Sequence, residues 1–282
     1  MYIPPIKLHR FRTDLAILLV LLLLFPLAAW PAGFLLSAPP TETASRSAEI
    51  YQPIAEFFSR ITGDVIRYEY PENWPAYVRN MQNGRYDIVV DAPHFVSWRS
   101  EKLEHLPLVS LADKMEYVVV VRDEPGIKSL QDLRGKTACS APIPNMDALA
   151  LLDQYESSWS QPKILATVGF AKSFEMLSGD ECDAAVLPLR TYLALVAAPG
   201  QSPTRLLFTS QVMPHLAFSA SPRLGERRRT QIRDALLGNA SIGPMVNLNR
   251  HYGLDGTVMT RVVADPDAYS GYAYLLEEFW GF

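Results

Sequence analysis

The stretch from Tyr117 to Asn145 constrains the fold more than any other part of the chain. Residues 117–121 are a β-branched run without alternation, which is typical of a strand buried on both faces. A Pro-Gly turn and a short helix capped by Ser129 follow, and a second strand over 136–140 stops at two prolines. This order predicts a two-lobed α/β protein in which the chain crosses between lobes here. The 140–145 loop is then expected to face the cleft between them.

The first 32 residues read as an export signal. Basic residues precede the apolar run Leu15–Ala28, as in a secretory signal peptide. The apolar run continues to Leu36, so a transmembrane anchor is the competing interpretation. We favour a signal peptide over residues 1–32, because residues 33–37 also predict a first strand. We therefore expect a periplasmic or other extracytoplasmic protein, with a membrane tether if the segment is retained.

The remaining chain of about 250 residues is long enough for one large or two ordinary domains. The whole sequence has a formal net charge of −4 at pH 7, and removal of the basic leader makes it more acidic. An acidic exported chain has no electrostatic footprint for nucleic acid. The basic run Arg227–Arg229 is interpreted as a solvated helix face.

Two cysteines, Cys139 and Cys182, allow one disulfide in an oxidising compartment. We place each on a predicted parallel strand, with Cys182 opening its strand and Cys139 well inside its own. That stagger would hold the Cα atoms beyond the limit of about 7 Å for a disulfide. Two buried thiols are therefore our prediction.

Helices and strands alternate along the rest of the chain, which predicts mostly parallel, doubly wound sheets with ligand sites at the carboxyl ends of the strands. Met81–Pro93 and Met176–Pro188 share a helix end, a Gly, an Asp, a buried strand and a Pro. This echo on either side of the crossing favours two similar lobes. We expect a first lobe over 33–118 and 217–282 and a second lobe over 119–216. Two hinge strands, Tyr117–Arg122 and Leu216–Ser219, are expected to join them.

With these elements placed, the chain resembles the phosphate/phosphite/phosphonate-binding proteins of ABC importers, the PhnD-like family. The most specific match is Ile127-x-Ser129-Leu130-x-Asp132-Leu133-x-Gly135-Lys136-Thr137, and further matches are Tyr51-x-Pro53-Ile54-x-x-Phe57-Phe58, Gly84-x-x-Asp87-Ile88-Val89 and Pro93-x-Phe95. The resemblance implies a type II periplasmic-binding-protein fold that closes two lobes on a phosphonate-, phosphite- or phosphate-like oxyanion. It also implies an ABC permease in the inner membrane as partner.

One loop departs from this family. Where relatives usually have a Ser/Thr-rich loop with Gly that opens a helix, this chain has Ser140-Ala141-Pro142-Ile143-Pro144-Asn145-Met146-Asp147. Hydroxyls and free N–H groups at a helix start bind oxyanions. The two prolines remove two such donors, and Asp147 adds negative charge. Ser140 can still donate, and Asn145 can still cap the helix.

Further candidate ligand residues follow strands or match the family. His94 follows a buried strand, and its imidazole can donate to an anion or ligate a metal, the alternative being a packed histidine. Asp91 can accept from a cation or cap the next helix. Tyr51 can hydrogen-bond a ligand or serve as a core aromatic. Trp74 can cover an apolar ligand face or pack on Tyr70.

A metal site is the less favoured alternative. His94, Met213 and His215 together would suit copper, since imidazole and thioether are ligands that copper accepts. They lie far apart in sequence with no metal-binding spacing, so we predict no metal and no cofactor. We also expect no enzymatic activity, because no nucleophile elbow, zinc-protease motif or phosphate-binding P-loop is present.

The sequence therefore predicts an exported, monomeric solute-binding protein that closes two lobes on a small molecule for an ABC importer. A membrane-tethered ligand-sensing or scaffold domain and a metal-delivery protein on the same fold are the alternatives.

Overall fold

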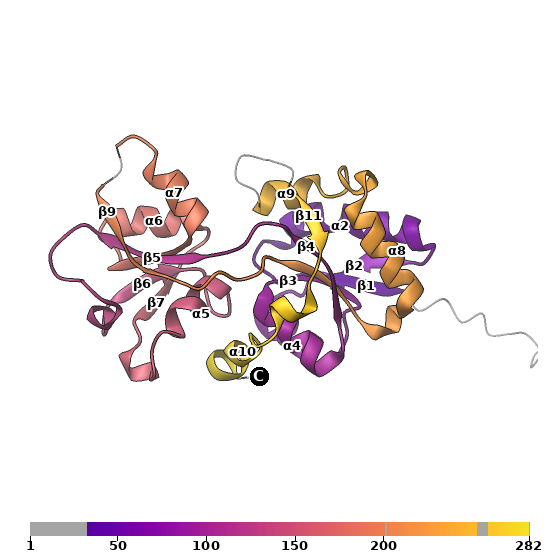
Figure 1. The fold of residues 1–282 in the computed structure, drawn as a ribbon, viewed down its shortest axis with the longest axis horizontal. Helices are drawn as coiled ribbons and strands as arrows, with labels where there is room; N and C mark the ends of the chain where they lie inside the picture. The colour runs from indigo at the N-terminus through magenta and orange to yellow at the C-terminus, as the bar shows by residue number, and fades with distance from the viewer. Residues whose placement is uncertain (1–32, 201, 253–258, 282) are drawn as a thin grey trace, which may run out of the picture. The chain divides into compact units, whose positions relative to one another are not determined.

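Two β-sheets, each with its own helices, form the part of the chain that the computed structural model describes, residues 33–200, 202–252 and 259–281 (Figure 1). The leader predicted over residues 1–32 lies outside these residues. In the described residues no helix has the length and apolar character needed to cross a membrane. We call the six-stranded sheet with its helices lobe I and the five-stranded sheet with its helices lobe II.

Lobe I contains the strand order β11-β4-β10-β3-β1-β2. Its strands are β1 (Phe34–Ser37), β2 (Ile66–Tyr68), β3 (Ile88–Asp91), β4 (Leu106–Leu111), β10 (Ala217–Ala220) and β11 (Arg261–Val263). Its helices are α2 (Ala44–Thr62), α3 (Trp74–Gln82), α4 (Pro93–Leu103), α8 (Gly225–Leu237) and α9 (Val246–Tyr252). Strands β1, β2 and β3 pair in parallel, whereas β10 runs antiparallel to both β3 and β4.

Lobe II contains the strand order β7-β6-β8-β5-β9. Its strands are β5 (Tyr117–Arg122), β6 (Thr137–Ser140), β7 (Lys163–Ala166), β8 (Ala184–Pro188) and β9 (Thr204–Thr209), and its helices are α5 (Met146–Leu152), α6 (Phe170–Ser178) and α7 (Leu189–Val196). Strand β5 is antiparallel to β8 and β9, while β6 is parallel to β7 and β8. The β-branched run therefore forms a buried strand, as predicted.

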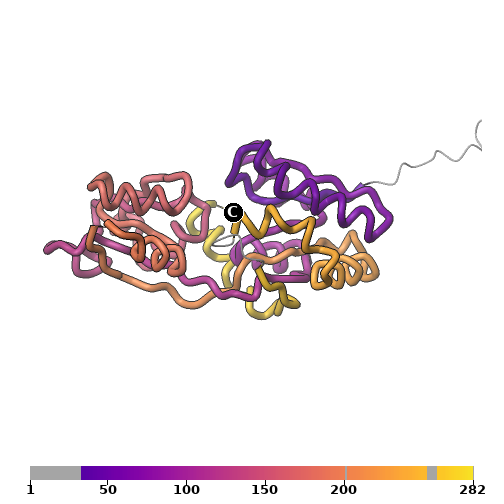
Figure 2. The backbone as a smooth tube through the Cα atoms, turned by 90° about the horizontal axis from the view of Figure 1, so that it is seen from above, coloured from indigo at the N-terminus to yellow at the C-terminus, as the bar shows by residue number. Residues whose placement is uncertain are grey.

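The chain passes between the lobes twice, and the two passages lie side by side (Figure 2). Met115 and Met213 form a two-hydrogen-bond antiparallel bridge, with both N···O distances 2.9 Å. The predicted hinge strands lie beyond this bridge, since Tyr117 already pairs with Pro188 in lobe II and Ala217 pairs with Asp91 in lobe I. The bridge, rather than either strand, is the segment where the two passages meet.

The last helix, α10 (Tyr274–Trp280), contacts both lobes. Leu276 and Trp280 pack with the lobe I cluster around Tyr77 and Phe95. Leu275 belongs to the lobe II core cluster that includes Tyr117 and Leu149. The Tyr274 hydroxyl also donates to Asp153 of lobe II at 2.7 Å. This last helix therefore connects the two lobes by apolar contacts.

Cys139 and Cys182 form a disulfide with a Cα–Cα distance of 6.0 Å, so the prediction of two thiols was wrong. Cys182 does not open strand β8, which starts at Ala184; it lies in the preceding turn. Asp180 in that turn has a left-handed φ of 62°, and the turn brings Cys182 back beside β6. The expected separation of the two Cα atoms assumed that both cysteines lie in extended neighbouring strands, and this assumption was wrong for Cys182.

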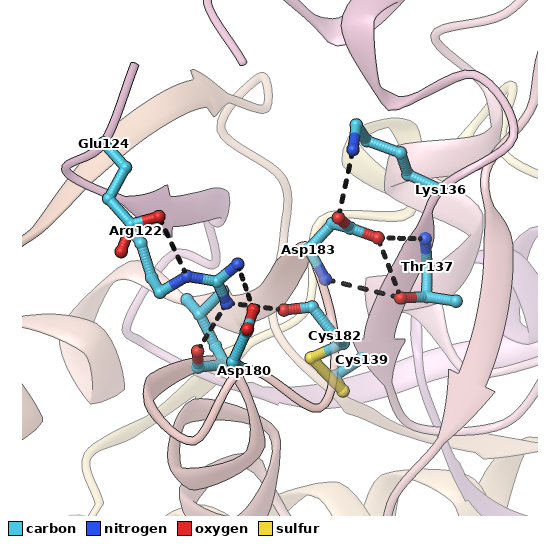
Figure 3. A network of polar contacts seen from close by, with 9 residues as sticks. Arg122, Glu124, Lys136, Thr137, Cys139, Asp180, Cys182 and Asp183 are labelled. Atoms are coloured by element: carbon cyan, nitrogen blue, oxygen red, sulfur yellow. Dashed lines mark hydrogen bonds and ion pairs between the residues drawn. A yellow bond between two sulfur atoms is a disulfide. The ribbon is translucent and has the colours of Figure 1, made fainter. Parts of the chain in front are cut away.

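Polar contacts hold the same turn on both sides of the disulfide (Figure 3). The Asp183 carboxylate accepts from the Thr137 backbone N–H at 2.8 Å and from Lys136 at 3.2 Å. Arg122 donates to the carbonyls of Leu177 and Cys182 at 2.8 and 2.9 Å. These contacts fix β6, whose end leads into the 140–145 loop.

Removing the disulfide with Cys139→Ala and Cys182→Ala is expected to lower the free energy of unfolding by about 2–4 kcal/mol, because the bridge restricts the unfolded chain. Urea titration of the double variant measures this loss. The Thr137→Val variant, which removes the two hydrogen bonds of the Thr137 hydroxyl with Asp183 and leaves the disulfide in place, provides the control with a smaller loss. Equal stability of the double variant and the wild type would contradict the expectation.

Candidate ligand-binding site

The lobes meet at a hydrogen bond between His94 and Pro144. His94 is the second residue of α4 in lobe I, and Pro144 lies in the loop between β6 and α5 in lobe II. The His94 Nε2 atom is 2.9 Å from the Pro144 carbonyl oxygen, and His94 is only 1 % exposed. The 140–145 loop therefore faces lobe I, and one predicted site residue lies at the junction.

His94 is neutral in the folded protein. Burial lowers the pKa of its imidazole from 6.5 to about 3, and the bond to the Pro144 carbonyl opposes that effect only in part. A neutral imidazole has one donor and one acceptor nitrogen. His94 therefore cannot offer a positive charge to an anion at any physiological pH.

Asp91 is paired with a buried arginine of lobe I. Its carboxylate accepts from Arg99 Nε at 2.6 Å, and both side chains are completely buried. The Tyr77 hydroxyl donates to the other carboxylate oxygen, and Arg99 in turn donates to that hydroxyl oxygen at 3.0 Å. Asp91 does not cap α4 either, whose N-cap position is Ala92 without a side-chain bond. The capping role predicted for Asp91 was therefore wrong, and both oxygens of its carboxylate already have partners within lobe I.

Ser140 and Asn145 bond within their own loop. The buried Ser140 hydroxyl donates to the Ala141 carbonyl at 2.9 Å. Asn145 occupies the N-cap position of α5, but its side-chain amide donates to the Pro142 carbonyl at 2.6 Å and makes no capping bond. The loop thus satisfies the side-chain donors that were predicted to bind a ligand.

Asp147, in the first turn of α5 directly after this loop, has a larger role than the sequence indicated. Its buried carboxylate accepts from the Ala141 backbone N–H at 2.8 Å. Burial raises its pKa from 3.8 to about 7, while hydrogen bonds from the backbone N–H groups of Ala141, Ala148 and Asp147 itself lower it. An acidic residue in the first turn of a helix was the available signal, because carboxylates favour that position.

Tyrosine hydroxyls from both lobes lie near the junction. The hydroxyl oxygens of Tyr51 in α2 and Tyr252 in α9 are 3.4 Å apart. Burial, then the charge of Asp147 and the Tyr252 hydroxyl, raise the pKa of Tyr117 in β5. These phenols stay protonated, and each can donate or accept one hydrogen bond. Tyr51 therefore pairs with a hydroxyl of its own lobe, and the link to lobe II is the effect of the Tyr252 hydroxyl on Tyr117.

Trp74 packs in an aromatic cluster rather than on Tyr70. Its ring stacks on Phe95, with centroids 6.0 Å apart, and meets Trp280 of α10 edge-on at 5.6 Å. Phe95 also contacts the His94 ring at 4.3 Å. Trp74 thus supports the helix start that positions His94.

The three residues of the metal hypothesis serve other contacts. The Met213 backbone forms the bridge with Met115, and His215 Nδ1 accepts from the Leu216 backbone N–H at 2.8 Å. In the described residues no three His, Cys, Asp or Glu side chains could jointly hold a metal ion. No observation in this part of the chain supports a copper site.

A cavity of about 240 Å³ lies in lobe I away from these residues. Residues of β4, α8 and the β11 region line it, namely Leu106, Pro107, Leu108, Glu226, Arg229, Thr230, Arg233, Val263, Ala264 and Pro266. None of the sequence-predicted site residues contributes to it.

Comparison with known proteins gives one family. The family described as "ABC transporter, phosphonate, periplasmic substrate-binding protein" matches residues 36–252. No curated protein sequence matches the chain.

Similar solved structures share the fold at low sequence identity. XAC2383 from Xanthomonas citri, bound to chloride ion, is 15 % identical over 86 % of this chain and 95 % of that chain, with a TM-score of 0.66. PhnD1 from Prochlorococcus marinus (MIT 9301), in complex with methylphosphonate, is 12 % identical over 88 % and 98 %, with a TM-score of 0.65. A binding protein component of an ABC phosphonate transporter (PA3383) from Pseudomonas aeruginosa is 12 % identical over 84 % and 82 %, with a TM-score of 0.59.

The fold class predicted from the sequence is thereby confirmed, as a two-lobed type II periplasmic-binding-protein fold. The family match covers most of the chain and includes strands of both sheets, so it is not a match to one local motif. The chain belongs to the family of periplasmic substrate-binding proteins that serve phosphonate ABC transporters.

Proposed function

We propose that this protein captures a small solute at the junction of its lobes, around His94, Asp147 and the tyrosines Tyr51, Tyr117 and Tyr252, and delivers it to an ABC permease in the inner membrane. The His94–Pro144 hydrogen bond carries the proposal, because it brings polar groups of both lobes to one buried place. Membership of a transport family supports the general role and gives no reason to expect catalysis.

Capture works by a change in the distance between lobes. Opening about the Met115–Met213 bridge separates His94 from the Pro144 carbonyl and exposes both to water. A ligand that contacts both lobes stabilises the closed form, so its binding energy shifts the open–closed equilibrium. Helix α10 adds apolar contacts to both lobes and therefore favours closure even without ligand.

Small-angle scattering of the full chain in mild detergent tests capture, with the thermal midpoint measured in parallel. A ligand at about 100 times its dissociation constant adds about 2.7 kcal/mol of stability, which raises the midpoint by roughly 5–10 °C for a domain of this size. We expect a solute that gives this shift also to reduce the radius of gyration. A midpoint shift without compaction would contradict closure on the ligand.

The intact mass of the exported protein distinguishes the tethered sensor or scaffold from the released binding protein. We propose removal of residues 1–32 and a soluble monomer that visits its permease. Retention of the leader would favour the tethered role instead. Metal delivery predicts that His94→Ala abolishes metal uptake, whereas we expect no stoichiometric metal in either the wild type or this variant.

A further inference from the structure

The tautomer of His94 can be assigned from its partner. A carbonyl oxygen accepts hydrogen bonds and never donates them. The Nε2 atom that lies 2.9 Å from the Pro144 carbonyl must therefore carry the proton. Since the ring is neutral, Nδ1 carries none and is a hydrogen-bond acceptor.

That acceptor has no partner in the described part of the chain. The Nδ1 atom is buried and makes no hydrogen bond, and the whole residue is 1 % exposed. A buried acceptor left unpaired is costly, and native proteins rarely tolerate one without a reason. A hydrogen-bond donor on a ligand would satisfy it when the lobes close.

The facing loop of lobe II has few free hydrogen-bond donors for an anion. The Asp147 carboxylate already takes the backbone N–H groups of Ala141 and Ala148 and its own. The Ser140 hydroxyl and the Asn145 amide donate to carbonyls of the same loop. Pro142 and Pro144 have no N–H. A ligand oxyanion would compete with an internal carboxylate for the same donors.

No positive charge compensates for that carboxylate. The causes that set the pKa of Asp147 are burial and backbone hydrogen bonds, with no contribution from a Lys or Arg of the described residues. The charge of Arg99, the buried guanidinium of lobe I, is neutralised by its ion pair with Asp91. The tyrosine hydroxyls can donate or accept, so they do not determine whether the ligand must be a hydrogen-bond donor or an oxyanion. His94 and Asp147 determine this.

We propose that the ligand presents a hydrogen-bond donor, a protonated amine or a hydroxyl, to His94 Nδ1, and that Asp147 excludes phosphorus oxyanions from the loop before α5. This inference rests on the proposed function, since it names the chemical class of the solute held at the same junction. His94 and Asp147 are then the residues that determine ligand specificity. A phosphonate ligand would have to carry an amine or a hydroxyl and to place its phosphorus group elsewhere.

Two matched sets of probes test the proposal on the full chain in mild detergent at pH 8, where Asp147 is ionised. The donor set is ethanolamine, glycine and glycerol, and the oxyanion set is phosphate, phosphite and methylphosphonate. Thermal midpoints report binding, and the ¹⁵N resonance of His94 Nδ1 reports whether that atom receives a hydrogen bond. We expect at least one donor probe to raise the midpoint and shift the resonance, and no oxyanion to do either.

Three variants make the test specific. His94→Phe keeps a ring but has no acceptor, and it should weaken donor binding at least about tenfold, the size of one lost hydrogen bond. His94→Gln keeps an acceptor and should restore part of the affinity. His105→Phe is the matched control, because His105 is also buried in lobe I with an unpartnered Nδ1 and a pKa of about 3. It should bind the donor probe as the wild type does.

The outcomes separate the inference from the proposed function. Binding of methylphosphonate or phosphate without a donor response would overturn the inference and leave a solute-binding protein standing. Donor binding that survives His94→Phe would also overturn it. A flat response to both sets, with no change in scattering, would count against the proposed function and would remove the inference with it.

Discussion

Lowering the pH from 7 to 5 is expected to destabilise the folded protein by about 4 kcal/mol, which is a large share of the stability of a typical domain. Three buried histidines cause the loss. Burial lowers the pKa of His94 and of His105 to about 3 and that of His215 to about 4, from an ordinary value of 6.5. At pH 5 they are neutral in the folded protein and protonated in the unfolded chain, so acid favours unfolding.

The magnitude follows from proton linkage. Each histidine contributes about 2 kcal/mol between pH 7 and pH 5, or about 6 kcal/mol for the three. Asp147 acts in the opposite sense, because burial raises the pKa of its carboxyl to about 7. The folded state therefore binds a proton at Asp147 more readily than the unfolded chain does over the same interval. This offsets about 2 kcal/mol of the stability lost through the histidines.

Urea titrations at pH 7 and pH 5 measure the difference. Asp147→Asn removes the carboxyl that opposes the histidines, so this variant should lose about 6 kcal/mol of stability between pH 7 and pH 5. His105→Phe removes one histidine and should reduce the loss to about 2 kcal/mol. A wild-type stability that is constant over this interval would show that the histidines are not held neutral.

Arg99→Met is expected to cost about 3–5 kcal/mol, because it leaves the Asp91 carboxylate buried without its cation. The Arg99–Asp91 pair has an Nε–Oδ2 distance of 2.6 Å and no exposed surface on either side chain. The substitution also removes a bond to the Tyr77 hydroxyl. Thermal unfolding measures the loss, which should lower the midpoint by roughly 6–20 °C for a domain of this size.

The exposed pair Arg85–Glu69 is a matched control for the effect of burial. Its Nε–Oε1 distance is also 2.6 Å, but Arg85 is 50 % exposed. Arg85→Met should therefore cost less than about 1 kcal/mol. The double variant Arg99→Met with Asp91→Leu removes both charges and should recover part of the loss. Equal effects of Arg99→Met and Arg85→Met would mean that the buried pair contributes no more than a surface pair.

The sequence predicted helices and strands well where their formation depends on residues close together in the chain. The run Tyr117–Val121 became strand β5, and the first strand predicted over residues 33–37 is β1, Phe34–Ser37. Ser129 caps the short 3₁₀ helix Leu130–Leu133 as expected, with Asp132 completing a capping box. Steric preference, capping and apolar periodicity act over a few residues, and a single sequence carries them in full.

The candidate site was only partly accessible from sequence. The loop after β3 was identified, and so was the departure in the loop before α5, because both follow strand ends. The ion-pair and hydrogen-bond partners of the residues in these loops were not identified from the sequence. Asp91 is paired with Arg99 on the next helix, and His94 is paired with a carbonyl 50 residues away. The disulfide was missed for the same reason, since a turn rather than a strand positions Cys182.

The sequence by itself determined the class of element at each position, the alternation that builds two α/β lobes and the family to which the chain belongs. Only the tertiary structure decided which polar groups are already satisfied. Hydrogen-bond pairing and burial depend on groups that are distant in the chain, and these two quantities set the charge of His94 and Asp147. The ligand chemistry that we propose therefore depends on the contact between the lobes rather than on any one segment of the sequence.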